Sequence, residues 1–308
     1  MKNRPPKDLA ASVANRLLQL SRQTGADYQI ILLRFAIERL MYRLTQSSHS
    51  EEFVLKGAML FVVWTGNTYR PTKDLDFLAL ESASPEGLAA VFREICLVEV
   101  IDDAMVFAPT SVRAEAIREE AVYQGVRVRL EARLGKIVLP LQVDVGFGDV
   151  VSPKARKADF PPLLEFPAPR LAMYRRETVV AEKFEAMVTL GLGNSRMKDY
   201  YDVWTLSQEF DFDGQALSAA IHATFKRRRT DLPEDTPMGL SDDFAADSQK
   251  RLQWQGFIRR GRLAVAESHL ATVVRAIRTF LAPAFTAASG TAKFDQHWTK
   301  GGPWRANE

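Results

Sequence analysis

The sequence predicts an α+β protein, in which a mixed β-sheet core follows N-terminal helices and precedes a largely helical C-terminal region. Three patterns predict it. Apolar residues recur at spacings of three and four in residues 9–47, they alternate with polar residues between 116 and 151, and helical spacing returns until about residue 285. We therefore expect a sheet core over residues 1–160, a helical domain over 161–285 and a poorly ordered tail over 286–308.

The composition is that of an ordinary globular protein. Of the 308 residues, 46% are hydrophobic and 26% are charged. The net charge of +3 permits contact with a polyanion but does not argue for it. The single cysteine, Cys96, excludes an internal disulfide framework and fits a reducing compartment. Because we find neither a signal-peptide pattern nor an apolar run long enough for a membrane span, we expect a cytoplasmic protein without a membrane partner.

The elements of the core follow from local patterns. Two helices are expected within residues 9–47, separated at Gly25. The segment "FVLKGAMLFVVW" (53–64) has two apolar runs around a Lys-Gly step, which predicts a strand, a tight turn and a helix. The residues "DLDFLAL" (74–80) predict a strand, and residues 86–97 a helix.

Strong alternation over residues 116–151 predicts a β-hairpin or meander with its turn at Gly135-Lys136. Five prolines in residues 152–170 are expected to end the sheet and to mark the domain boundary. Beyond them we expect two helices around "GLGN", then mostly helix with a loop near 231–243.

Three carboxylates suggest a cation site. Asp74 and Asp76 stand at i and i+2 of one strand, so they share a face and repel each other unless a cation lies near. Asp144 lies between two valines, where an unpaired buried carboxylate is costly. Oxygen ligands suit Mg²⁺, and the turn at Gly57 offers backbone N–H groups to a phosphate. The alternative for the Asp pair is a solvated turn.

A second group of charged residues lies in the helical region. Lys183 stands in an apolar helix, where it either extends to solvent at the helix edge or contacts a phosphate. Asp199 and Asp202 share one face of the next helix, where ordinary helix-start chemistry explains them equally well.

Basic residues alternate with aromatic ones in "KRLQWQGFIRRGR" (250–262), a composition found on both nucleic-acid surfaces and ordinary amphipathic helices. The four histidines lack metal-ligand spacing, and the sequence contains neither a P-loop nor a dinucleotide-binding fingerprint.

With these residues identified, the chain resembles the AbiEii-type nucleotidyltransferase toxins of bacterial abortive-infection (toxin–antitoxin) systems, within the DNA polymerase β-like nucleotidyltransferase superfamily. The resemblance extends from about residue 10 to about residue 280. It implies a nucleotidyltransferase core followed by a helical region that completes the active site. Six motifs carry it: "RFAIERLMYRL" (34–44), "FVLKGAMLF" (53–61), "RPTKDLDF" (70–77), "LQVDVGFGD" (141–149), "ETVVAEKFEAMV" (177–188) and "SRMKDYYDVW" (195–204).

The resemblance also implies roles for individual residues. Lys183 would contact the triphosphate or stabilise charge on the leaving pyrophosphate. Ala58 departs from the family, in which a glycine or serine often follows this glycine step, so phosphate binding must depend on backbone N–H groups. The implied metal ligands for Mg²⁺ (or Mn²⁺) are Asp74, Asp76 and Asp144; the implied catalytic residues are Asp74, Asp76, Lys183 and Asp199; the implied nucleotide-binding residues are Lys56, Gly57, Ala58, Arg70, Thr72 and Asp202.

The implied activity is transfer of a nucleotide from an NTP to RNA, the tRNA 3′ end in some family members, with release of pyrophosphate and a block of translation as part of phage defence. The implied partner is a winged-helix antitoxin. Two alternatives stay open: a nucleotidyltransferase that modifies a protein or small molecule, and a non-catalytic module that binds nucleotide or RNA.

Overall fold

The computed structural model describes residues 8–66, 70–119, 123–263, 269–290 and 293–307. The chain divides into two compact units. The first contains Met1–Gly148 and Arg156–Met173, and the second contains Asp149–Ala155 and Tyr174–Glu308. The sequence led us to expect a single boundary at residue 160. Instead, the chain crosses into the second unit at Asp149, returns to the first at Arg156 and crosses into the second unit again at Tyr174.

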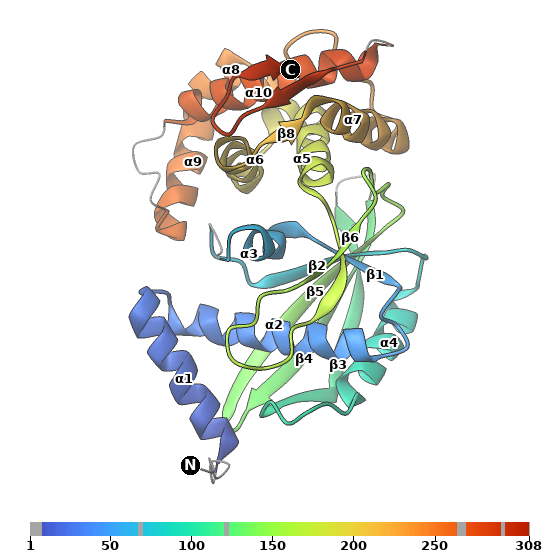
Figure 1. Ribbon diagram of the computed structural model, residues 1–308, viewed down its shortest axis with the longest axis vertical. Coiled ribbons are helices and arrows are strands. Elements are labelled where there is room, and N and C mark those ends of the chain that lie inside the picture. The colour runs from blue at the N-terminus through green and yellow to red at the C-terminus, as the bar shows by residue number, and fades with distance from the viewer. Residues whose placement is uncertain (1–7, 67–69, 120–122, 264–268, 291–292, 308) are drawn as a thin grey trace. The chain divides into compact units, whose positions relative to one another are not determined.

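A seven-stranded mixed sheet forms the centre of the first unit (Figure 1). β2 pairs with β5 in parallel and with β1 antiparallel, so the mixed sheet that the sequence predicts is confirmed. In order across the sheet the strands are β3 (Met105–Glu119), β4 (Tyr123–Leu134), β5 (Ile137–Phe147), β2 (Asp74–Ala79), β1 (Phe53–Lys56), β7 (Arg170–Met173) and β6 (Arg156–Asp159).

The helices of the first unit begin and end at residues suited to those positions. Asp8 and Asp27 accept backbone hydrogen bonds at the starts of the first two helices, and Gly25 ends the first in the left-handed conformation. The two expected N-terminal helices are therefore confirmed. The helices are α1 (Leu9–Thr24), α2 (Tyr28–Gln46), the short 3-10 helix η1 (Gly57–Met59), α3 (Leu60–Thr65) and α4 (Pro85–Leu97).

One face of the sheet is apolar and is covered by α2 and α4 (Figure 1). Phe53 on β1 contacts the rings of Phe77 on β2 and Phe92 on α4. Because side chains alternate along a strand, the residues between these apolar positions point to the opposite face. The acids of β2 and β5 therefore lie on the face away from α4.

The proline-rich passage does not end the sheet. β6 and β7 lie within residues 152–173, and β7 adds to β1 in parallel. Phe160, between them, is fully buried, and its N–H donates to the carbonyl of Pro169. Prolines are compatible with this arrangement because they lie outside the two four-residue strands.

The second unit is largely helical, as predicted. Phe184 on α5 stacks on Phe285 of α10 and contacts Phe225 of α7, which defines the centre of its core. Its helices are α5 (Arg176–Leu190), α6 (Met197–Glu209), α7 (Gly214–Arg228), α8 (Asp242–Ala246), α9 (Ser248–Gly261) and α10 (Leu270–Ser289), with 3-10 turns η2 (Gly191–Gly193) and η3 (Met238–Leu240).

The C-terminal segment is ordered, in contrast to the expected tail. β9 (Gln296–Trp298) pairs with β10 (Trp304–Ala306) and with β8 (Phe212–Asp213) in a three-stranded sheet. Trp298 is buried, and its indole N–H donates to the carbonyl of Ser207 at 2.7 Å. Burial of aromatic side chains holds this segment in place. The sequence of the segment has little periodicity, and for that reason we had expected a poorly ordered tail.

Helix α10 is long and apolar enough to cross a membrane by length and composition alone, and it is the single such helix among the described residues. No such segment was expected from the sequence. One face of α10 is buried against α6 and α7, as expected of a core helix, which satisfies the same length and composition criteria.

Candidate active site

Four charged residues occupy adjacent positions across four strands of the first unit. Lys56 on β1 is the register partner of Asp76 on β2, Asp76 is the partner of Asp144 on β5, and Asp144 is the partner of Arg127 on β4. Neighbouring strands lie about 4.8 Å apart, and register partners point to the same face. The two acids therefore lie side by side with a cationic residue at each end, and we call this set the charged row.

Gly57 packs directly against the carboxylate of Asp76. Its φ is +74°, and a Cβ built on it would lie 1.9 Å from Asp76 Oδ2. A side chain at this position would meet both backbone strain and a collision, so only glycine fits. The turn predicted from the Lys-Gly step is thus confirmed, and it brings the backbone of η1 onto the acid of β2. Ala58, the next residue, is buried.

Asp144 is held by Arg127. The guanidinium Nε donates to Oδ1 and Nη2 donates to Oδ2, each at 2.8 Å, and Gln142 approaches Oδ2 at 3.4 Å. The hydrogen bond to Asp144, with a smaller opposing effect of burial, raises the pKa of Arg127 above its ordinary value. The flanking Val143 and Val145 are buried on the other face of the sheet. The side chain of Asp144 is 22% exposed to solvent. Asp144 is therefore a partly exposed, paired carboxylate and not a buried one.

The remaining predicted residues of this unit lie along β2 or beside it. Asp74 shares the face of Asp76 and pairs in register with Gln142. Thr72 donates from its hydroxyl to the carbonyl oxygen of Asp74 at 3.4 Å, and Arg70 is half-buried. The side chain of Lys56 reaches towards β5. A Cβ built on Gly146 of that strand would lie 3.7 Å from the Nζ of Lys56.

The carboxylates of the charged row, together with Asp74, are only partly suited to hold a hard divalent cation. Asp74 and Asp76 offer carboxylate oxygens on one face, which Mg²⁺ prefers. Asp144 uses both oxygens to accept from Arg127. Within the described ranges, no three His, Cys, Asp or Glu side chains form a cluster that could hold a metal ion. The fit is therefore good for the pair on β2, whereas each oxygen of Asp144 already accepts one hydrogen bond from Arg127.

In the second unit, Lys183 joins α5 to α6. Its Nζ lies 2.5 Å from Asp199 Oδ1 and 2.9 Å from Asp202 Oδ2, and Arg196 Nε lies 2.7 Å from Asp199 Oδ2. The shared face predicted for Asp199 and Asp202 is thus occupied by Lys183. Lys198, also in this motif, is exposed.

The electrostatics of this cluster are those of a buried network. The side chain of Asp199 is fully buried, and that of Lys183 is 14% exposed. Burial acts to raise the pKa of Asp199, but Lys183 and Arg196 together outweigh it, so the pKa lies below its ordinary value. Asp199 is therefore ionised in the folded protein and stabilised by two cations.

Arg127 belongs to the site although its residue type and neighbours in the sequence did not predict it. The sequence nevertheless contained the pairing. Arg127 stands seven residues before Leu134, the last residue of β4, and Asp144 stands seven residues after Ile137, the first residue of β5. A two-residue hairpin turn fixes the register of its strands, so the predicted turn at Gly135-Lys136 already placed Arg127 opposite Asp144.

Comparison with known proteins identifies the family. A family model described as "Nucleotidyl transferase AbiEii toxin, Type IV TA system" matches residues 39–287. No curated protein sequence matches. A crystal structure of a candidate nucleotidyltransferase from H. pylori is similar in fold, with 11% identity, a TM-score of 0.50, and coverage of 85% of this chain and 97% of that one.

A second crystal structure, of JHP933 from Helicobacter pylori, has 12% identity, a TM-score of 0.49, and coverage of 85% of this chain and 94% of that one. The family match covers most of the chain and includes both charged clusters described above. The chain therefore belongs to the AbiEii nucleotidyltransferase toxin family of type IV toxin–antitoxin systems, and this membership makes it a transferase with a nucleotide substrate and an antitoxin partner.

Proposed function

We propose that this protein is a cytoplasmic toxin that uses Mg²⁺ to transfer a nucleotide from an NTP to RNA, with the 3′ end of tRNA as acceptor, and thereby blocks translation. The observation that carries the proposal is the position of Gly57 against Asp76 within the charged row. A left-handed glycine that opens η1 brings backbone N–H groups next to an acid pair, which combines a phosphate-binding feature with a cation-binding one.

The acids of β2 are the proposed cation ligands. Asp74 and Asp76 would hold Mg²⁺ or Mn²⁺, and Asp144 would contribute from β5 while Arg127 fixes its orientation. When bound, the cation supplies charge neutralisation at the reacting phosphate and lowers the pKa of the acceptor hydroxyl. Lys56, Arg70 and Thr72 are proposed to contact the nucleotide.

The proposed reaction is an in-line displacement at the α-phosphate. The oxygen of the acceptor hydroxyl forms a new bond to the α-phosphorus, and the bond from that phosphorus to the oxygen bridging to the β-phosphate breaks. Pyrophosphate leaves with that oxygen, and the hydroxyl proton passes to solvent. Because little covalent chemistry falls to the protein, orientation and charge neutralisation by the charged row supply most of the catalysis.

Lys183, Asp199 and Asp202 enter the proposal through the family resemblance. Lys183 would act on the triphosphate, with the two acids holding it in place. Their contacts in the second unit support a structural role at least as strongly, since Lys183 already faces two carboxylates. Substitutions in this cluster therefore need a stability measurement beside each activity measurement.

The proposal is tested by incubating the purified chain with each α-labelled NTP, Mg²⁺ and total RNA. We expect label in RNA with the unaltered chain and none with Asp74→Asn or Asp76→Asn, which change the charge but little of the shape. Full activity in these variants overturns the site assignment.

The acceptor is tested in the same reaction by treatment with RNase. Label that disappears supports RNA, and fractionation then locates it on tRNA. Label that persists on protein contradicts RNA as the acceptor and favours a protein-modifying transferase. Tight NTP binding without transfer to RNA or protein contradicts catalysis itself.

A further inference from the structure

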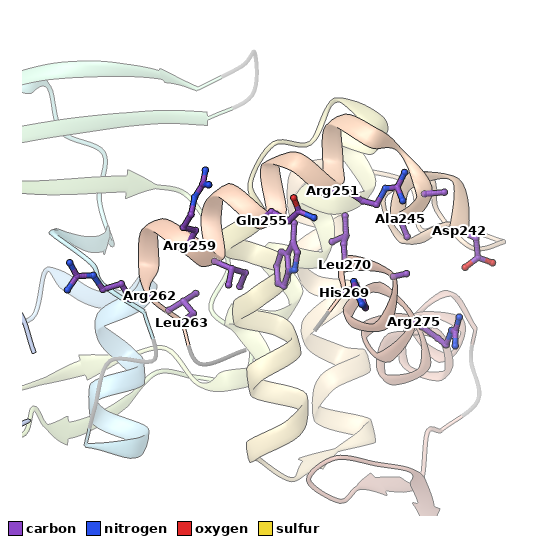
Figure 2. A pocket seen from close by; sticks show the side chains of 14 residues that line it. Asp242, Ala245, Arg251, Gln255, Arg259, Arg262, Leu263, His269, Leu270 and Arg275 are labelled. Carbon is purple, nitrogen blue, oxygen red and sulfur yellow. The ribbon is translucent and has the colours of Figure 1, made fainter. Parts of the chain in front are cut away.

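The second unit contains a pocket formed by α8, α9 and α10 that is separate from the clusters described above (Figure 2). Its volume is about 970 Å³. The α9 side of the pocket includes six of the thirteen residues of the basic and aromatic segment at 250–262, whose role composition alone left open. The pocket lies within a single unit, so its shape follows from that unit by itself.

The lining residues of α9 follow one stripe of the helix. Arg251, Gln255, Arg259 and Arg262 follow one another at steps of three or four residues, and Ile258 stands three residues after Gln255, which brings all five to the same side. Figure 2 shows Arg251, Arg259 and Arg262 spaced along this helix. At 1.5 Å per residue, the first and last of these arginines are about 17 Å apart along the axis.

The pocket carries an excess of positive charge. Arg275 on α10 adds a fourth guanidinium, and all four arginines are exposed. Among the described residues, none of the four forms an ion pair with an acid. The one acid in the lining, Asp242, contacts Arg278 instead, at 3.1 Å. Four cations that pair with no acid among the described residues favour an anionic ligand, and the spread of the three on the α9 side exceeds what a single phosphate group spans.

The floor of the pocket is apolar. The lining residues Ala245, Leu263 and Leu270 are buried, and His269, which also lines the pocket, is exposed. Histidine and arginine planes are surfaces on which unpaired bases stack, while the charged groups follow the phosphate chain. A cationic rim over an apolar floor therefore fits a single strand with exposed bases better than a duplex, whose bases are already stacked.

We propose that the α8–α9–α10 pocket binds a single-stranded segment of the RNA acceptor, independently of the charged row. This inference rests on the proposed function for the identity of the polyanion, but binding can be measured without any nucleotide transfer. Arg262 ends α9 in the left-handed conformation, with φ at 49°, a position where glycine is usual.

The test is fluorescence anisotropy with the full chain and a short fluorescein-labelled single-stranded RNA, in the absence of NTP and Mg²⁺, over a range of salt concentrations. The variants are Arg259→Ala, Arg262→Ala and the two combined. The matched control is Arg260→Ala, which removes the same exposed charge from the opposite side of the same helix and does not line the pocket.

We expect the combined variant to weaken RNA binding about tenfold and to reduce the slope of log affinity against log salt by about 0.7 for each lost phosphate contact. Arg260→Ala should change neither the affinity nor the slope. Because the four arginines are exposed, thermal melting should be the same for all variants and the unaltered chain.

Two results overturn the proposal: no RNA binding by the unaltered chain, or equal weakening in the pocket and control variants. A third arm uses polyglutamate as the probe. Binding of polyglutamate that depends on Arg259 and Arg262, without RNA binding, overturns RNA in favour of an acidic protein segment. Asp76→Asn separates the two proposals, because it should bind RNA normally whether or not transfer from NTP is ever observed.

Discussion

Arg127 and Asp144 face each other across β4 and β5, and the guanidinium donates one hydrogen bond to each carboxylate oxygen at 2.8 Å. A carboxylate has about four lone-pair positions, so this pairing leaves each oxygen with capacity for another partner. The arginine therefore fixes the orientation of Asp144 without exhausting it. Arg127 is a positioning residue in this reading, and not a substitute for a cation.

The first prediction concerns this pair. Arg127→Gln should lower transfer activity and raise the Mg²⁺ concentration needed for half-maximal activity, each about 10–100-fold, as is typical when a partner of a metal-binding carboxylate is lost. The measurement is a Mg²⁺ titration of initial rates. Arg129→Gln is the control, because Arg129 lies two residues along β4 and pairs with Glu115, outside the charged row. An unchanged Mg²⁺ dependence in Arg127→Gln would reduce the pair to a surface salt bridge.

The second prediction separates backbone strain from the site. Gly57→Ala and Gly66→Ala each place a Cβ on a left-handed residue, which costs about 1–2 kcal/mol of folding free energy. At Gly66 no atom of the described residues lies within 4 Å of the new Cβ, whereas at Gly57 the new Cβ collides with the carboxylate of Asp76. Activity should therefore be lost in Gly57→Ala and kept in Gly66→Ala, with rates measured well below both melting temperatures. Equal activity in the two variants would contradict a role for the contact between Gly57 and Asp76.

The third prediction concerns pH. The pKa of Asp199 is lowered in the folded protein, so its stabilising effect is fully present above the unfolded value of about 4 and is lost as the pH falls through the lower folded value. Asp199→Asn should reduce the free energy of unfolding by about 3 kcal/mol at neutral pH, because it removes a charge from a buried network. The difference from the unaltered chain should stay constant above about pH 5 and shrink below about pH 4.

Urea unfolding at a series of pH values measures this difference. Glu209→Gln is the control, since Glu209 is an exposed acid at the end of the same helix and should have little effect at any pH. A difference for Asp199→Asn that grows in acid would mean that the carboxylate is not held ionised by Lys183 and Arg196.

The fourth prediction is that one substitution changes stability and RNA binding in opposite directions. Arg262→Gly should raise the free energy of unfolding by up to about 1 kcal/mol, because glycine adopts the left-handed conformation without the steric cost, offset in part by its greater freedom when unfolded. The same substitution should weaken RNA binding. Arg229→Gly, at the left-handed end of α7, should give the same gain in stability with RNA binding unchanged. Thermal melting and anisotropy on the same samples decide it.

Much of the fold could be predicted because its signals are local. Capping by Asp8 and Asp27, the left-handed Gly25 and the alternation of Val126 with Arg127 each depend on a few neighbouring residues. β6 and β7 were missed, because each has only four residues and lies among prolines that usually end a sheet. The C-terminal strands were missed because the burial of Trp298 depends on contacts distant in sequence.

Some features of the candidate site could likewise be predicted from local sequence, whereas others depend on contacts between distant segments. The residue types on β2 and β5 indicated acid chemistry, and the hairpin turn already contained the register that pairs Arg127 with Asp144. The contact between Gly57 and Asp76 could not be derived, because it depends on how β1 aligns with β2 across a connection of 17 residues. The pairing of Lys183 with both Asp199 and Asp202 likewise depends on how α5 packs against α6.

The late addition of β7 to the sheet has a consequence for synthesis on the ribosome. β1 carries the lysine of the charged row and leads to Gly57. Its second neighbour, β7, is made only after residues 149–155, which belong to the other unit. Until Met173 has emerged, β1 is an open edge of the nascent sheet, available to pair with other chains. A toxin assembled in this order remains incomplete through more than half of its translation, and a fragment that stops at Gly148 should aggregate and not accumulate as a folded domain.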